Sequence, residues 1–302
     1  MFKLLKLTES YIFVLIVAIT IGLLLSKQAN FFFSYISLFL AIIFFLASIK
    51  LDLSHFLAEI KNAKIIIFLV LFMMLILPAL VYLVAKPLIP TYAFALLLLA
   101  AMPAGMTAPL LSEVAGGRTS LALVFVVITS LIAPFTVPLV LKIFAGKIVV
   151  LSFVDMFLKL TKIIFIPFIL AQIARYFFHK KIKTVYWALK PVSIILLGLL
   201  IAGVVANQAT LIKTNISSFL PAILIMSAYF LLMPYLTLLI TKKYETSTRI
   251  SIAVAVTFTN FTLSIYIAAT FFPEPQILIP TILTVLPWSL GFIPFKYLAK
   301  KF

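Results

Sequence analysis

Cysteine, histidine and acidic residues are scarce in this sequence of 302 residues, and each scarcity excludes a kind of site. The absence of cysteine excludes disulfides, thiolate metal ligands and cysteine nucleophiles. The two histidines, His55 and His179, leave little for a zinc site, and we interpret both as solvated loop residues. The seven acidic residues are outnumbered by 24 lysines and arginines, which gives a net charge of +17.

Apolar residues dominate the composition instead, with 65% hydrophobic residues and a mean hydropathy of +1.31. A soluble domain with a polar surface cannot be built from such a chain. Apolar runs close to the length of about 20 residues that crosses a bilayer recur along the sequence. The composition therefore predicts an all-α membrane protein with ten transmembrane helices. Their expected limits are residues 10–26, 31–49, 65–85, 91–114, 119–143, 154–178, 187–207, 217–241, 248–272 and 277–298.

The positions of the basic residues predict the orientation of these spans. With the N-terminus inside, 17 of the 24 lysines and arginines, Lys50 and Lys190 among them, fall on the face that carries both termini. Because basic residues collect in cytoplasmic loops, we expect a multi-pass protein of the inner (plasma) membrane with both termini cytoplasmic. The basic excess then indicates contact with a lipid bilayer that has anionic headgroups, and not with nucleic acid. Attraction of an anionic solute is the alternative interpretation.

Two segments of the sequence match each other at a constant offset of 156 positions. LILPALVYLVAK and LLMPYLTLLITK share Pro78 with Pro234 and Lys86 with Lys242, as well as several leucines. Five spans separate the matched positions, so the second copy must be inserted upside down relative to the first. The pattern predicts two inverted five-helix repeats, residues 1–147 with spans 1–5 and residues 148–302 with spans 6–10.

Helix-breaking residues lie in the middle of the fourth span, in the stretch AMPAGMTAPLL. Pro103 and Pro109 lack a backbone N–H and Gly105 adds conformational freedom, so the helix should unwind over residues 103–107 and restart. The same offset places the polar stretch AVTFTNFTLS, residues 255–264, at the corresponding point of the ninth span. Unpaired backbone groups are costly in hydrocarbon, so a break persists only where protein, water or a solute satisfies it.

Two broken helices at matching depths predict a binding site for a solute. A half-helix that begins near Thr107 directs its positive dipole end at the membrane midplane, which favours a carboxylate, and Asn260 can donate and accept hydrogen bonds. The alternative is that the hydroxyls only repair the breaks or join packed helices. The candidate substrate-binding residues are Pro103, Ala104, Gly105, Met106, Thr107, Thr257, Thr259, Asn260 and Thr262.

These motifs resemble the bile acid:sodium symporter family in its ten-span bacterial and archaeal form. The resemblance rests on ASIKLDLSHFLAEIKNAK after the second span, on the break at Pro103 to Gly105 with the following GGRTSLALVFVVITSLIAP, and on TFTNFTLS around Asn260. It implies a panel domain of spans 1, 2, 6 and 7 beside a core domain of spans 3, 4, 5, 8, 9 and 10. It also implies that crossed broken helices 4 and 9 hold an organic anion, and that access alternates between the two sides. The related arsenite exporters rely on a cysteine, which this chain lacks.

The positions that correspond to the family's sodium ligands carry other residues here. The resemblance places the replacements at Met73, Ala108, Pro109, Ala122, Val126, Ala255 and Thr259, whereas Asn260 is retained. The sequence therefore predicts no cofactor and no metal site, and it disfavours sodium as the coupling ion. Glu113, about two turns beyond the fourth-span break, is the candidate for proton coupling. A solvated helix-end carboxylate near Arg118 is its alternative interpretation.

Taken together, the motifs favour a secondary membrane transporter of a small organic anion, with a carboxylate as the expected partner. It would work as a uniporter, an exchanger or a proton-coupled carrier. The alternative is a transport-inactive scaffold or sensor of the same fold. An enzyme is not expected, because the spans lack the aspartate pair, Ser/His pair or metal cluster of an intramembrane hydrolase. The sequence does not identify the solute.

Overall fold

The computed structural model describes residues 11–51, 63–145, 152–215, 217 and 219–301. This part of the chain is helical, and its isolated β-bridge joins Ala104 to Thr259. His55 and the boundary expected between residues 147 and 148 lie outside the described residues. The helices are α2 (Tyr11–Leu24), α3 (Ser26–Ala29), η1 (Asn30–Tyr35), α4 (Ile36–Ser48), α6 (Ala63–Leu71), η3 (Phe72–Ile76), α7 (Leu77–Leu88), α8 (Pro90–Ala100), α9 (Ala108–Ala115), α10 (Thr119–Ala145), α11 (Phe153–Asn207), α12 (Ala209–Thr214), α13 (Phe219–Ile240), α14 (Thr246–Thr257), α15 (Phe261–Phe271), α16 (Pro275–Leu283) and α17 (Val285–Ala299).

Within the described residues, five helices are long and apolar enough to cross a membrane. The bent pair α16 and α17 is a sixth candidate. The five are Ser26–Ser48, Ile66–Leu88, Thr119–Phe144, Thr184–Asn207 and Phe219–Ile240. Shorter apolar helices, among them α8 and α15, fall within the spans that we expect to be broken. The chain is therefore a multi-pass α-helical membrane protein.

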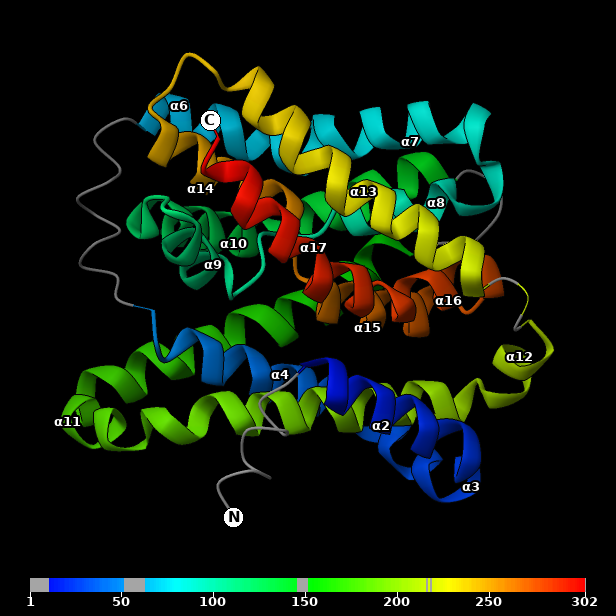
Figure 1. The fold of residues 1–302 in the computed structure, drawn as a ribbon. Coiled ribbons are helices and arrows are strands. Elements are labelled where there is room, and N and C mark those ends of the chain that lie inside the picture. The colour runs from blue at the N-terminus through cyan, green and yellow to red at the C-terminus, as the bar shows by residue number, and fades with distance from the viewer. Residues whose placement is uncertain (1–10, 52–62, 146–151, 216, 218, 302) are drawn as a thin grey trace.

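The expected sixth and seventh spans are two helical segments that meet at Phe178. Within α11, which runs from Phe153 to Asn207, Phe178 has a non-helical φ of −121° and ψ of 22°, and the helix turns back on itself there (Figure 1). The end expected for the sixth span at residue 178 is therefore confirmed. Residues 179–186, expected to form a loop, are helical instead, since no glycine or proline between Phe178 and Pro191 stops the second segment.

The tenth span contains a bend that the sequence analysis does not predict. The stretch expected to be one helix over residues 277–298 is split into α16 and α17, whose axes differ by 45°. The hydroxyls of Thr281 and Thr284 donate to the carbonyls of Ile277 and Pro280, at 2.6 and 2.8 Å. Threonines that bond back to the preceding turn bend helices, and Pro287 removes one further backbone donor.

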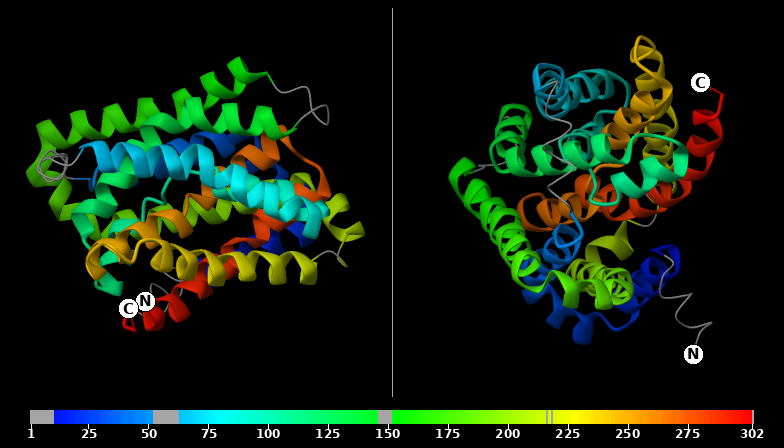
Figure 2. Two further views of the ribbon diagram at one scale, coloured as in Figure 1. Left: turned by 90° about the horizontal axis from the view of Figure 1, so that it is seen from above. Right: turned by 90° about the vertical axis from the view of Figure 1, so that its left-hand side faces the viewer.

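The helices form two groups that face each other (Figures 1 and 2). One group consists of α2, α4 and α11, which pack closely together along one side of the molecule. Gly203 of α11 allows part of this packing, because a Cβ atom there would lie 2.7 Å from the backbone nitrogen of Phe33. The second group contains α7, α8, α10 and α13 to α17. It meets the first mainly where α10 packs against α11, with smaller contacts of α17 with α2 and of α15 with α4.

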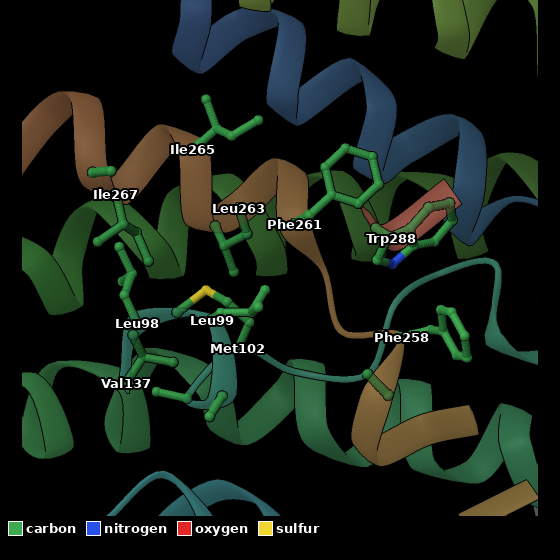
Figure 3. Packing of buried hydrophobic residues seen from close by; sticks show 14 of the residues in the cluster. Leu98, Leu99, Met102, Val137, Phe258, Phe261, Leu263, Ile265, Ile267 and Trp288 are labelled. Carbon is green, nitrogen blue, oxygen red and sulfur yellow. The ribbon is translucent and has the colours of Figure 1, made fainter. Parts of the chain in front are cut away.

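The second group has the more deeply buried centre. Every residue of α15 from Phe261 to Ala269 is buried, and so is every residue of α14 from Arg249 to Thr257. Leu98 and Leu99 at the end of α8 lie close to Ile267 and Leu263 of α15 (Figure 3). Helices that are buried on all sides have no lipid-facing stripe, which is typical of the centre of a membrane protein. The two helix breaks lie in this buried region.

Candidate solute site at the crossing of two broken helices

The fourth span is broken where the prolines and the glycine predict it. Helix α8 ends at Ala100, α9 begins at Ala108, and residues 101–107 between them are not helical. Pro103 interrupts the helical hydrogen bonds, and Pro109 stands in the first turn of α9, where a missing N–H costs nothing. The expected unwinding over residues 103–107 is confirmed.

The ninth span is broken as well, over a shorter stretch. Helix α14 ends at Thr257 and α15 begins at Phe261, so that three residues form the break. Asn260 is the N-cap of α15, and its side-chain oxygen accepts a hydrogen bond from the backbone N–H of Leu263 at 3.1 Å. Asparagine is among the strongest N-cap residues, which explains why the helix restarts at this position.

The two breaks cross and satisfy each other's backbone groups. Ala104 and Thr259 form an antiparallel bridge, in which the N–H of Gly105 donates to the carbonyl of Phe258 at 3.0 Å. The N–H of Asn260 donates to the carbonyl of Pro103 at 2.8 Å. Side chains complete the set, because the Ala104 N–H donates to the Thr129 hydroxyl at 3.0 Å and the Thr259 hydroxyl donates to the Leu99 carbonyl at 3.1 Å.

Only glycine fits at position 105 of this crossing. A Cβ atom there would lie 2.5 Å from the carbonyl oxygen of Phe258 and 3.2 Å from that of Thr259. The sequence analysis treats Gly105 as a source of backbone freedom, but its φ angle is not in the left-handed region, where Gly116 alone is found among the described residues. Its role is to let two backbones approach.

A cavity of about 900 Å³ lies between the two helix groups and reaches the crossing. Its volume is near the upper end of the range for small-molecule sites. Six of the nine candidate residues line it, namely Gly105, Met106, Thr107, Thr259, Asn260 and Thr262. Pro103, Ala104 and Thr257 do not, although all three lie at or beside the breaks. The opposite wall consists of α4 and α11 residues such as Phe44 and Ser193.

Two residues that line this cavity have a polar group without a partner. The hydroxyl oxygens of Thr107 and Ser289 are fully buried and make no hydrogen bond with the described residues. Asn260 is 8% exposed, and because its oxygen caps α15, its amide N–H groups remain for a solute. Ser289 is not among the residues predicted from the sequence. It belongs to α17, which reaches the cavity after a bend in the tenth span that has no clear sequence signal.

Aromatic rings form one side of the same cavity. Phe261, the first residue of α15, lies beside Trp288 of α17, with 4.8 Å between the ring centroids (Figure 3). Both residues line the cavity. The ring of Phe258, in the break between α14 and α15, packs against Trp288 with 6.0 Å between the ring centroids. The donors at the crossing therefore adjoin a broad apolar surface, as in most sites for small organic molecules.

Two lysines stand in the wall that the first helix group contributes. Lys50 follows the end of α4, and Lys190 lies in α11. Burial and the positive charge of Lys190 lower the pKa of the Lys50 ammonium group. The sequence analysis counts both lysines only as orientation signals. Lys190 lies inside the expected seventh span, residues 187–207, and a charged residue within a span usually faces a cavity or the interior of the bundle. This signal could have placed Lys190 in the cavity wall.

Glu113, the candidate for proton coupling, does not line the cavity. It lies on the exposed side of α9, one turn before the helix ends at Gly116 with a φ of 87°. This position agrees better with a carboxylate at a helix end than with a group inside the site. Its place near the end of α9 is the one expected from the sequence.

The positions that the resemblance assigns to sodium ligands carry mostly apolar side chains in the structure. Met73, Ala108, Ala122, Val126 and Ala255 are all buried, at most 3% exposed, and none offers a side-chain oxygen. The Thr129 and Thr259 hydroxyls hold the crossing together, whereas the buried hydroxyls of Thr257 and Ser130 make no hydrogen bond with the described residues. Within the described part of the chain, no three acidic or histidine side chains gather where they could hold a metal ion.

Part of the chain is similar in sequence to known proteins. Residues 37–215 match the model of the Sodium Bile acid symporter family. A protein of Bacillus subtilis (strain 168), described as an uncharacterized sodium-dependent transporter YocS, is 27% identical over 194 residues. That alignment covers 63% of this chain and 60% of the relative, so the chain matches well under two thirds of the relative's length.

Proposed function

Because the chain belongs to the sodium bile acid symporter family, we propose that it is a secondary transporter that carries a small organic anion by alternating access. The observation that carries the proposal is the crossing of two broken helices at a cavity of about 900 Å³. A structural scaffold has no physical need for two breaks in buried helices, since each break gives up helical hydrogen bonds in a medium without water.

The chemistry of the crossing supports an anionic solute. The N-terminal ends of α9 and α15 both start at the crossing, and each carries the positive end of a helix dipole. The amide N–H groups of Asn260 supply hydrogen bonds that a carboxylate accepts. Phe261 and Trp288 would contact an apolar part of the same molecule.

Alternating access is supported by the division of the helices into two groups. In this proposal α2, α4 and α11 correspond to the panel of spans 1, 2, 6 and 7, and the remaining helices form the core. The cavity lies between them, so a movement of one group relative to the other would close it on one side and open it on the other. The antiparallel crossing supports two inverted five-helix repeats within ten spans.

We also propose that the protein lies in the inner (plasma) membrane and that the open side of its cavity faces the cytoplasm. Lys50, Thr119 and Lys190 line the cavity, and all three belong to segments that the distribution of basic residues assigns to the cytoplasmic face. Both termini would then lie on that side. The excess of positive charge there suits a bilayer leaflet with anionic headgroups.

Coupling to sodium is not part of the proposal. The name of the Bacillus relative describes a sodium-dependent transporter, but the ligand positions of this chain hold apolar side chains. A monovalent cation that leaves water needs several oxygens, and the Thr129 and Thr259 hydroxyls of the crossing already hydrogen-bond to backbone groups. Uniport or exchange of anions fits these residues best.

Uptake into proteoliposomes distinguishes a transporter from a scaffold. A transporter will move an organic anion that raises the thermal stability of the purified protein, because a ligand of the native state stabilises it. The Asn260→Ser variant is the matched control, since serine keeps an N-cap acceptor for α15 but has no amide N–H groups. Binding without transport by the wild-type protein would favour the scaffold or sensor of the same fold.

A further inference from the structure

Helix α15 of the second helix group contacts the first group at two points outside the cavity (Figure 1). At the first point, the hydroxyl of Ser37 in α4 donates to the phenol oxygen of Tyr266 at 3.4 Å. At the second point, the ammonium group of Lys159 in α11 lies over the ring of Phe271, 4.9 Å from its centroid. Each contact therefore joins the two helix groups through side chains.

The contact between Ser37 and Tyr266 lies just beyond one end of the cavity. In α4 the cavity-lining residues begin at Leu40 and continue towards Lys50, which follows the helix. Ser37 precedes Leu40 by about one helical turn, on the side away from Lys50. Tyr266 is 2% exposed, and its hydroxyl reaches across the boundary between the two groups. The boundary is therefore closed next to this end of the cavity.

The contact between Lys159 and Phe271 lies further from the cavity. In α15 the cavity-lining residues are Phe261 and Thr262 at the start of the helix, whereas Phe271 is its last residue. The helix axis between its first and last residues is about 15 Å long, since an α-helix rises about 1.5 Å per residue. Lys159 also pairs with the carboxylate of Asp155 at 3.0 Å, which restrains its side chain. The two contacts thus follow one another along α15, away from the cavity.

Both contacts are weak enough to be broken and remade. A distance of 3.4 Å between the Ser37 and Tyr266 oxygens is long for a hydrogen bond between hydroxyls, for which about 2.7–2.8 Å is usual. The Lys159 side chain is 42% exposed, and cation–π contacts at exposed sites are the weaker ones. A protein that alternates between two states needs contacts that favour one state without trapping it.

We propose that these two contacts of α15 are the gate that closes the cavity at the end away from Lys50. This inference rests on the proposed function, since only a cavity that opens to each side in turn needs a gate. Separation of the two groups at this end would break both contacts. Their removal destabilises the closed state and leaves the open state unchanged, so the population shifts towards opening at this end.

Cysteine accessibility measures the state of this gate directly, because the chain has no cysteine of its own. Ser193→Cys places one thiol at a partly buried position of α11 that lines the cavity. The rate at which a membrane-impermeant maleimide labels this thiol is measured in right-side-out and in inside-out vesicles, without any added solute. With the gate contacts intact, we expect labelling from the side of Lys50 and slow labelling from the other, closed side.

Variants of the gate contacts should raise the rate of labelling from the closed side. Tyr266→Phe removes only a hydroxyl and Lys159→Gln removes only a charge, so neither change leaves a large cavity. We expect each variant to raise this rate roughly two- to fivefold, because contacts of this kind contribute about that factor to an equilibrium. The double variant should raise it on the order of tenfold, since separate contacts act additively in free energy.

Two matched variants are the controls. Phe94→Leu alters a ring that packs against Phe272 with 4.9 Å between the centroids, next to Phe271 but within the second helix group. Lys162→Gln removes an exposed lysine about one turn after Lys159 in α11, and Lys162 makes no ion pair or ring contact with a described residue. Both controls should leave labelling from the closed side unchanged.

The outcomes separate this inference from the proposed function, because labelling requires no solute. Unchanged labelling from the closed side in a folded double variant would overturn the gate, even if the protein transports an anion. Equal increases in the gate variants and the controls would also overturn it, since general loosening would then be the cause. If the double variant does not fold, the two single variants decide by the same criteria. A protein that moves no anion, but opens in the gate variants alone, would contradict the proposed function and support the gate.

Discussion

The backbone N–H of Gly105 donates to the carbonyl oxygen of Phe258 at 3.0 Å, and a Cβ atom on Gly105 would lie only 2.5 Å from that same oxygen. The two broken helices can therefore cross only while position 105 has no side chain. Since the obstacle is backbone, it cannot rotate away as a flexible side chain would. Every function assigned to the crossing depends on this contact.

The Gly105→Ala substitution will disrupt the crossing while the protein still inserts in the membrane. We expect a loss of about 1 to 3 kcal/mol in the free energy of unfolding, because overpacking of a dense site costs that much. Anion binding should fall below detection. Gly116→Asn is the control, since position 116 has open space around it and asparagine tolerates its φ of 87°. Normal anion binding by Gly105→Ala would contradict the assigned geometry.

The two ends of the Asn260 amide have different roles, which two variants can separate. Its oxygen caps α15, and its N–H groups face the cavity. Asn260→Ser should keep most of the stability but lose about 1 to 3 kcal/mol of anion binding, because serine caps well and lacks the amide donors. Asn260→Ala should lose in addition about 1 kcal/mol of stability. Titration calorimetry and thermal unfolding measure both. Unchanged affinity in Asn260→Ser would remove Asn260 from the site.

Local sequence signals predict part of this structure well. The break after Ala100 follows from Pro103 and Pro109, and the break before Phe261 follows from a cluster of residues that includes Asn260. Such residues act on their own backbone, so their effect is visible without knowledge of the fold. The all-helical membrane character follows from composition for the same reason.

Tertiary packing determines what the sequence does not predict. Helices such as α14 and α15 are apolar and buried on all sides, so no amphipathic pattern indicates which neighbours they have. The meeting of Lys50 with Lys190 depends on how α4 packs against α11, and each lysine alone is also a normal orientation signal. The bend at Thr284 depends on a hydroxyl bond that many straight helices also contain.

Anion binding will depend on pH through Lys50, which lines the cavity. Its pKa is lowered by burial and by the positive charge of Lys190. Lys50 therefore loses its proton at a lower pH than an exposed lysine, so anion affinity is highest below that pKa and falls as the pH rises through it. Calorimetry across the alkaline range will measure this fall.

The Lys50→Arg variant is the control for that titration. Arginine keeps its charge throughout the range, so this variant should bind the anion with little dependence on pH. An identical alkaline loss in the wild-type and Lys50→Arg proteins would assign the effect to another group.

Proton coupling through Glu113 is tested by the Glu113→Gln substitution. Because Glu113 lies on the exposed side of α9 and does not line the cavity, we expect anion uptake and its pH dependence to remain as in the wild-type protein. Uptake at several internal and external pH values provides the measurement. Loss of proton-driven accumulation in this variant would establish Glu113 as the carrier and would refute a simple uniporter or exchanger.

Flux of the best-binding anion into proteoliposomes, with sodium replaced by choline at fixed pH and membrane potential, tests most directly whether the crossing carries an anion without sodium. We expect saturable uptake at the same rate in both salts, abolished by Asn260→Ser and by Gly105→Ala. The apolar residues at the family's ligand positions, Ala122 and Ala255 among them, are the reason for this expectation. Accumulation that requires an inward sodium gradient, or a saturable rise in anion affinity with sodium, would contradict it.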